Sequence, residues 1–203
     1  MSLSAALWQN NTSEAERILV HGFVRGLGDG SLPVDCFKSY VAQDAYFLEA
    51  FARAYAFCLA NSTTREDLAD FAGLISGVLD ELKLHRVYAE RWQVDLAGVV
   101  PLAATQAYID FLLSIARRGD LGETIAAMTP CMRLYAFLGR ALSAGRVAPL
   151  YADWVKTYAD PGFEALAAQL ETLLDRHAED SDAVRANYAR AMDLEYGFFN
   201  ANL

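Results

Sequence analysis

The chain has 203 residues, of which 54% are hydrophobic and 21% are charged, with 13 glycines and 5 prolines. This composition excludes a disordered chain, a collagen-like repeat and a disulfide-knot scaffold. The formal net charge of -9 disfavours nucleic acid as a partner, because a protein that binds a duplex must neutralise phosphates. We expect one domain over residues 1–203.

Histidine and cysteine are scarce, with three residues of each type. Cys36, Cys58 and Cys131 form no paired-cysteine motif, which is typical of thiols that stay reduced in a cytosol. No apolar stretch approaches the length of a membrane span, and the first residues do not resemble a signal peptide. We therefore expect a soluble cytoplasmic protein without membrane contacts or a metal site.

Apolar residues recur at steps of three and four along almost the whole chain, which is the spacing of one helix face. Pro33, Pro101, Pro149 and Pro161 stand where a loop passes into a first helical turn. The pattern predicts helices over residues 3–9, 12–27, 33–60, 64–92, 101–118, 121–143, 147–158, 161–178 and 181–200. The linkers between them are short, so we predict an all-α, single-domain helical bundle around a central cavity or seam.

Asp44 interrupts an apolar helix face between Phe37 and Phe51. A carboxylate on such a face costs free energy unless it has a partner or a task. Two interpretations remain open at this point: a structural acid bound by a hydroxyl or an arginine, or a functional carboxylate.

Glu195 falls on an aromatic helix face, since Tyr188, Met192, Glu195 and Phe199 follow one another at helical spacing. Burial there would raise the pKa of its carboxyl group and suit it to act as a general acid. The alternative is a glutamate of the last helix that reaches solvent.

Cys131 follows Pro130, which lies inside the predicted helix 121–143. A proline there removes a backbone hydrogen bond and clashes with the carbonyl of Ala126, so we expect a kink beside the thiol. Tyr135 lies one turn further on the same face. The alternative is a small core cysteine without chemistry.

Two weaker candidates involve histidine. Glu81 and His85 share a helix face and could supply two metal ligands, but no second pair of this kind exists, so a buried ion pair or hydrogen bond is favoured. His21 could bind haem, yet a packing or capping role is favoured. Tyrosines such as Tyr108 and Tyr158 lie on apolar faces, which suits a pocket for a flat, hydrogen-bonding heteroaromatic ligand.

Together these residues resemble the TenA family of thiaminase II enzymes, which have a haem-oxygenase-like fold. The segment from His21 to Arg53 is similar to the family's opening, with its GDG turn, its Leu-Pro helix start and the pair Gln43 and Asp44. Further similar segments follow in the family's order: ELKLH at 81–85, the helix of Tyr108, PCMRLY at 130–135, YADWVKTY at 151–158 and EYGFF at 195–199.

The resemblance implies a hydrolase of thiamine salvage. Such an enzyme converts 4-amino-5-aminomethyl-2-methylpyrimidine to the 5-hydroxymethyl compound and ammonia, with thiamine as a second candidate substrate. By the family's pattern, Cys131 would be the nucleophile, Glu195 the acid and Asp44 the group that holds the 4-amino substituent. The same pattern implies four residues that line the substrate: Phe47, Tyr108, Tyr135 and Tyr158. It also implies a homotetramer that needs no metal or organic cofactor.

Four positions depart from the family's usual residues and leave the shape of the substrate open: Gly22, Phe47, Gly162 and Phe199. Two other classes of function also remain. One is a non-catalytic pyrimidine- or thiamine-binding protein, and the other is a redox protein of the same fold with haem on His21 or iron on Glu81 and His85.

Overall fold

Regular structure in this protein is entirely helical. The computed structural model describes residues 1–203, and its elements are α1 (Leu3–Asn10), α2 (Thr12–Leu19), α3 (Gly22–Asp29), α4 (Val34–Asn61), α5 (Arg65–Trp92), α6 (Ala103–Ala116), α7 (Leu121–Ser143), η1 (Pro149–Tyr151), α8 (Ala152–Tyr158), α9 (Pro161–His177) and α10 (Asp182–Ala201). The predicted all-α fold is therefore confirmed. None of these helices combines the length and the apolar character needed to cross a membrane.

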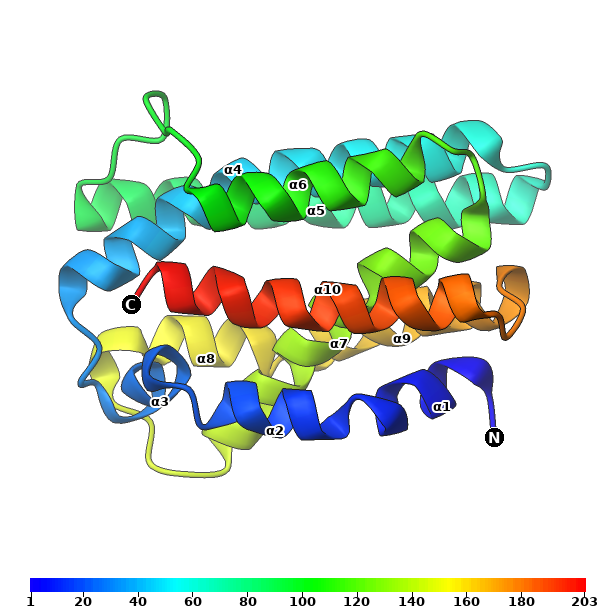
Figure 1. The fold of residues 1–203 in the computed structure, drawn as a ribbon. Helices are drawn as coiled ribbons and strands as arrows, with labels where there is room; N and C mark the ends of the chain where they lie inside the picture. Colours follow the sequence, from blue (N-terminus) through cyan, green and yellow to red (C-terminus); the bar gives the residue numbers. More distant parts are fainter.

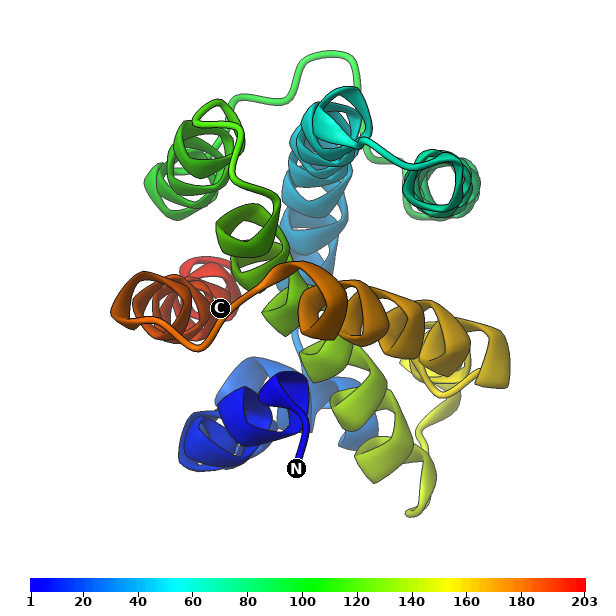
Figure 2. The same cartoon turned by 90° about the vertical axis from the view of Figure 1, so that its right-hand side faces the viewer.

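Helix α7 runs obliquely through the middle of the bundle (Figure 1) and is buried along most of its length. It packs against α6, α8, α9 and α10, and Figure 2 shows α4 to α6 on one side of it and α1 to α3 on the other. One cluster of 50 buried apolar residues joins these helices into a single core. The crossing of α7 and α8 needs a glycine, because a Cβ at Gly139 would lie 2.3 Å from the carbonyl carbon of Tyr158.

Two predicted helices were wrong in their extent. The predicted helix 12–27 is two helices, because His21 adopts an extended backbone and its Nδ1 accepts the amide hydrogen of Phe23 at 3.2 Å. This N-cap ends α2 and starts α3, so the capping role favoured for His21 is confirmed. The predicted helix 147–158 begins instead with the tight turn η1, and α8 spans only Ala152–Tyr158.

Helix α5 occupies the periphery of the bundle and packs mainly against α4 (Figure 2). Its outer surface exposes Leu79 and Val87. Its inward side carries His85, which is buried against α4. This helix therefore supplies one side chain to the interior while leaving an apolar surface outside.

Candidate active site

A small cavity between α4, α6, α7 and α10 gathers side chains from distant parts of the chain. The residues that line it are Asp44, Phe47, Tyr108, Cys131, Tyr135, Glu195 and Phe198. Six of the seven site residues expected from the sequence thus meet in one place. The seventh, Tyr158, lines an adjoining cavity instead.

Glu195 lies at the wall of this cavity and is 1% exposed, so the alternative of a solvent-reaching glutamate is wrong. The Tyr108 hydroxyl donates a hydrogen bond to its Oε1 at 2.8 Å. Burial raises the pKa of Glu195 to about 8, although hydrogen bonding from Tyr108 and Cys131 opposes the shift. The carboxyl group is therefore mostly protonated at neutral pH and can act as an acid.

Cys131 lies in α7 directly after Pro130, and the helix continues on both sides of the proline. The residue is half-buried, whereas Pro130 and Met132 beside it are buried. Burial raises the pKa of the Cys131 thiol well above its ordinary value, and the neighbouring charge of Glu195 adds to the effect. The thiol therefore needs a base before it can act as a nucleophile.

Asp44 is paired with a histidine, whereas the structural interpretation had considered a hydroxyl or an arginine as its partner. Its Oδ2 lies 2.7 Å from Nε2 of His85, and both side chains are almost fully buried. Burial lowers the pKa of His85, but the hydrogen bond and charge of Asp44 outweigh this effect and raise it to about 9. The pair is therefore a buried ion pair at neutral pH.

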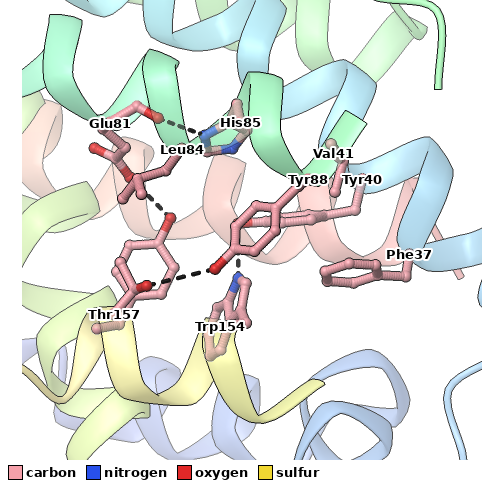
Figure 3. A pocket seen from close by; sticks show the side chains of 10 residues that line it. Phe37, Tyr40, Val41, Glu81, Leu84, His85, Tyr88, Trp154 and Thr157 are labelled. Carbon is pink, nitrogen blue, oxygen red and sulfur yellow. Dashed lines mark hydrogen bonds between the residues drawn. The ribbon is translucent and has the colours of Figure 1, made fainter. Parts of the chain in front are cut away.

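A second cavity, drawn in Figure 3, is lined by residues of α4, α5 and α8. Tyr158 in its wall donates a hydrogen bond to Oε1 of Glu81 at 2.8 Å, and the rings of Tyr135 and Tyr158 lie 4.8 Å apart between the two cavities. Burial, together with the charge of Asp44, raises the pKa of Glu81 to about 7. Tyr158 and Glu81 thus lie behind the wall that Tyr135 presents to the first cavity.

Several residues of this region were not expected from the sequence. Tyr40 accepts a hydrogen bond from Nε1 of Trp154 at 3.1 Å and donates one to the Tyr135 hydroxyl at 3.3 Å. Phe198 completes the wall of the first cavity. The available signal for Tyr40 was a hydroxyl on the same apolar stripe as Asp44, but such stripes are usually ordinary core.

Both ring nitrogens of His85 face hydrogen-bond partners in the structure. Nε2 of His85 faces Asp44, and Nδ1 faces the backbone carbonyl of Glu81 at 3.1 Å. His85 is thus held by buried hydrogen bonds, but its side-chain partner is Asp44, and the Glu81 carboxylate binds Tyr158 instead. The expected pairing of the Glu81 and His85 side chains is therefore wrong. No group of three or more His, Cys, Asp and Glu side chains is arranged to hold a metal ion.

The fold and the cavity define a class of protein: a helical bundle whose central helix presents a thiol to buried carboxyl groups. Comparison with known families then identifies it more closely, because the sequence model of the TENA/THI-4/PQQC family matches residues 8–203. The chain belongs to the TENA/THI-4/PQQC family.

Two relatives and one solved structure illustrate the match. The chain is similar to an aminopyrimidine aminohydrolase from Halalkalibacterium halodurans, with 33% identity over 88% of this chain and 83% of that protein. It is also similar to the mitochondrial bifunctional TH2 protein of Arabidopsis thaliana, with 32% identity over 98% of this chain and 37% of the relative. The chain thus spans little more than a third of the plant protein. A TenA family transcription regulator from Silicibacter sp. TM1040 has a TM-score of 0.92 and 28% identity, with coverage of 98% and 95% of the two chains.

Proposed function

We propose that this protein is an aminopyrimidine aminohydrolase of thiamine salvage that converts 4-amino-5-aminomethyl-2-methylpyrimidine to the 5-hydroxymethyl compound and ammonia. The observation that carries the proposal is the meeting of Cys131, the protonated Glu195 and the ion-paired Asp44 in one aromatic-walled cavity. Relatives that bear this name align with most of the chain. A flat pyrimidine ring suits walls made of Phe47, Tyr108 and other aromatic side chains.

In the proposed first step, Cys131 adds to the unsubstituted pyrimidine carbon adjacent to the one that bears the aminomethyl group. Glu195 beside the thiol removes its proton while ionised and delivers that proton to the ring nitrogen next to the attacked carbon. The carbon–sulfur bond forms as the ring C=N bond opens, and its electron pair ends as the nitrogen–hydrogen bond. The pKa of Glu195 near 8 suits a group that must both accept and donate a proton near neutral pH.

In the second step, the 4-amino group donates its lone pair through the ring, and the bond between the exocyclic carbon and the protonated 5-aminomethyl nitrogen breaks. Ammonia leaves, and a methylene group conjugated with the ring remains. Asp44 accepts a hydrogen bond from the 4-amino group as positive charge develops on it. Water then adds to the methylene carbon and loses one proton. The carbon–sulfur bond breaks as Glu195 returns the proton from the ring nitrogen to the sulfur, which restores the ring and the thiol. With thiamine as the substrate, the thiazole would leave in place of ammonia.

The decisive test is Cys131→Ser, which should lower the turnover of the aminomethylpyrimidine on the order of 10³-fold or more while the fold is retained. Cys36→Ser is the matched control, because the Cys36 thiol hydrogen-bonds the carbonyl of Leu203 and lies outside both cavities. Full activity of Cys131→Ser would remove the covalent mechanism. Tight binding of the pyrimidine by the unaltered chain without turnover would select the binding-protein alternative.

Alkylation gives a second test. The bound 5-hydroxymethyl product should protect Cys131 from a thiol reagent without protecting Cys36, and peptide mass mapping distinguishes the two sites. Equal labelling of Cys131 with and without the product would contradict the proposed site.

We also propose a homotetramer that works in the cytoplasm. The exposed apolar residues Leu79 and Val87 of α5 support an assembly, and three free cysteines suit a reducing compartment. Light scattering of the purified chain tests the assembly, since a monomer at micromolar concentration would contradict it.

A further inference from the structure

We infer that His85 is a specificity-determining positioning residue, which holds Asp44 as a carboxylate so that the cavity selects a 4-amino- over a 4-oxopyrimidine. The inference rests on the proposed function, because it concerns how the same cavity recognises its pyrimidine. His85 lies on α5 and does not itself line the first cavity.

The protons of the pair follow from its geometry. Nδ1 of His85 lies 3.1 Å from the backbone carbonyl oxygen of Glu81, and a carbonyl can only accept, so Nδ1 carries a hydrogen. A further proton lies between Nε2 of His85 and Oδ2 of Asp44, which are 2.7 Å apart. When that proton is on the histidine, the ring is a cation and Asp44 is an anion.

The surrounding groups favour this charged form. The groups that share the two cavities with the pair are Tyr40 on α4, Glu81 and Tyr88 on α5, Tyr108 on α6, Cys131 and Tyr135 on α7, Tyr158 on α8 and Glu195 on α10. None of these is a cation when ionised, and no lysine or arginine lines either cavity. His85 is therefore the one group there that can balance a carboxylate, and the acidic groups around it further favour its protonated ring.

The second carboxylate oxygen of Asp44 determines how the pair affects ligand binding. Oδ2 is bound by His85, whereas Oδ1 has no hydrogen-bond partner in the protein, and Asp44 lines the first cavity. An ionised carboxylate can only accept hydrogen bonds. It therefore binds a 4-amino group, which donates, and repels a 4-oxo group, which presents lone pairs.

The test compares two ligands rather than one activity. Calorimetry would measure the dissociation constants of 4-amino-5-hydroxymethyl-2-methylpyrimidine and its 4-oxo counterpart with the unaltered chain and with His85→Leu. The unaltered chain should prefer the amino compound by about 10- to 100-fold, as expected for one hydrogen bond to a charged group. His85→Leu removes the cation that faces Asp44 and should reduce the preference at least about tenfold.

A matched control uses the other histidine–aspartate pair of the chain, in which Nε2 of His177 lies 2.8 Å from Oδ1 of Asp67. His177→Gln should keep the preference for the amino compound, because this pair lines neither cavity. An unchanged preference in His85→Leu overturns the inference alone, since the unaltered chain would still bind and turn over the aminopyrimidine. If the unaltered chain binds neither compound, the proposed function falls and the inference falls with it.

A measurement on the unaltered chain covers the case in which His85→Leu does not fold. The chain has three histidines, so nitrogen NMR of their rings can be assigned with His21→Gln and His177→Gln. Both ring nitrogens of His85 should be protonated at pH 7, and the ring should lose a proton near pH 9. A neutral His85 ring at pH 7 overturns the inference.

Discussion

Two histidine–aspartate pairs involve α5, and they differ in how completely the aspartate is bound. His85 of α5 contacts Asp44 of α4 at 2.7 Å, and Asp67 of α5 contacts His177 of α9 at 2.8 Å. Both aspartates are buried, at 5% and 1% exposure. The contact distance and the burial are therefore nearly the same in the two regions, and the remaining partners make the difference.

Both carboxylate oxygens of Asp67 accept hydrogen bonds. It accepts hydrogen bonds from the Thr64 hydroxyl at 2.6 Å and from Arg176 and His177 at 2.8 Å each. The bond from Thr64 is the largest cause that lowers the pKa of Asp67 to about 2; burial opposes it, and the bonds from His177 and Arg176 add to it. Asp44, by contrast, keeps one oxygen free beside a cavity. A carboxylate whose two oxygens are both hydrogen-bonded within the protein stabilises the packing of helices, whereas one with a free oxygen is available to a ligand.

In this comparison of the two aspartates, the largest expected difference is in enzymatic activity. Asp44→Asn should lower kcat/KM for the aminomethylpyrimidine on the order of 10²-fold, because an amide cannot match a carboxylate facing the developing charge on the 4-amino group. Asp67→Asn should retain kcat/KM within about twofold but destabilise the fold by about 1–3 kcal/mol, since its buried hydrogen bonds are lost. Steady-state kinetics and urea denaturation check the two variants in parallel.

The comparison would break if Asp67→Asn lost as much activity as Asp44→Asn at a temperature where both are folded. The common feature would then be a histidine–aspartate pair rather than a free carboxylate oxygen. Circular dichroism at the assay temperature establishes that both variants are folded.

The pH dependence of stability should differ in direction between the pairs. The pKa of His85 is raised from 6.5 to about 9, so its contribution is fully present below about pH 6.5 and is lost as the pH rises through 9. The pKa of Asp67 is lowered from 3.8 to about 2, so its contribution is present above about pH 4 and is lost as the pH falls through 2. Free energies of unfolding measured across the pH range test both statements.

The raised pKa values of Glu81 and Glu195 also make stability fall as the pH rises. The contribution of His85 is therefore taken as the difference between the unaltered chain and His85→Leu, and that of Asp67 as the difference from Asp67→Asn. A difference for His85→Leu that does not shrink between pH 6.5 and pH 9 would contradict the ion pair.

The smallest expected effect is on stability and concerns the buried hydroxyl of Tyr188. The Tyr188 hydroxyl is buried without a hydrogen-bond partner, and Tyr188 lines neither of the two cavities. Tyr188→Phe should stabilise the fold by about 1 kcal/mol, because it removes this unmet group, and should leave turnover unchanged. Thermal denaturation and kinetics check it, and a loss of turnover would show that an unpaired group can matter here without facing a cavity.

Much of the fold could be predicted from the sequence because helical periodicity is a local property. The apolar steps from Phe37 to Tyr55 predicted the helix that became α4, and its observed span, Val34–Asn61, differs little from the predicted one. The break at His21 was missed, since a histidine at an N-cap interrupts a helix without disturbing the apolar spacing on either side. The turn before α8 was missed for a similar reason, because Tyr151 keeps the spacing of Trp154 and Tyr158.

The residues of the candidate site could likewise be predicted only in part. Asp44 and Glu195 could be singled out because a carboxylate on an apolar face is costly wherever that face is buried. The partner of Asp44 could not be deduced, because His85 lies 41 residues further along the chain on another helix. Tyr158 was grouped with the cavity residues, whereas the crossing of α7 and α8 places it behind Tyr135 with its hydroxyl on Glu81.

The sequence by itself determined the helical class, the apolar face of each helix and the few reactive groups on those faces. Periodicity specifies direction within one helix, since each residue is rotated by a fixed angle from the last. Only the tertiary structure decided which faces meet, and so which groups share a cavity and a proton. That decision depends on packing between helices, where a close approach such as that at Gly139 fixes one crossing among many that the helical spacing alone allows.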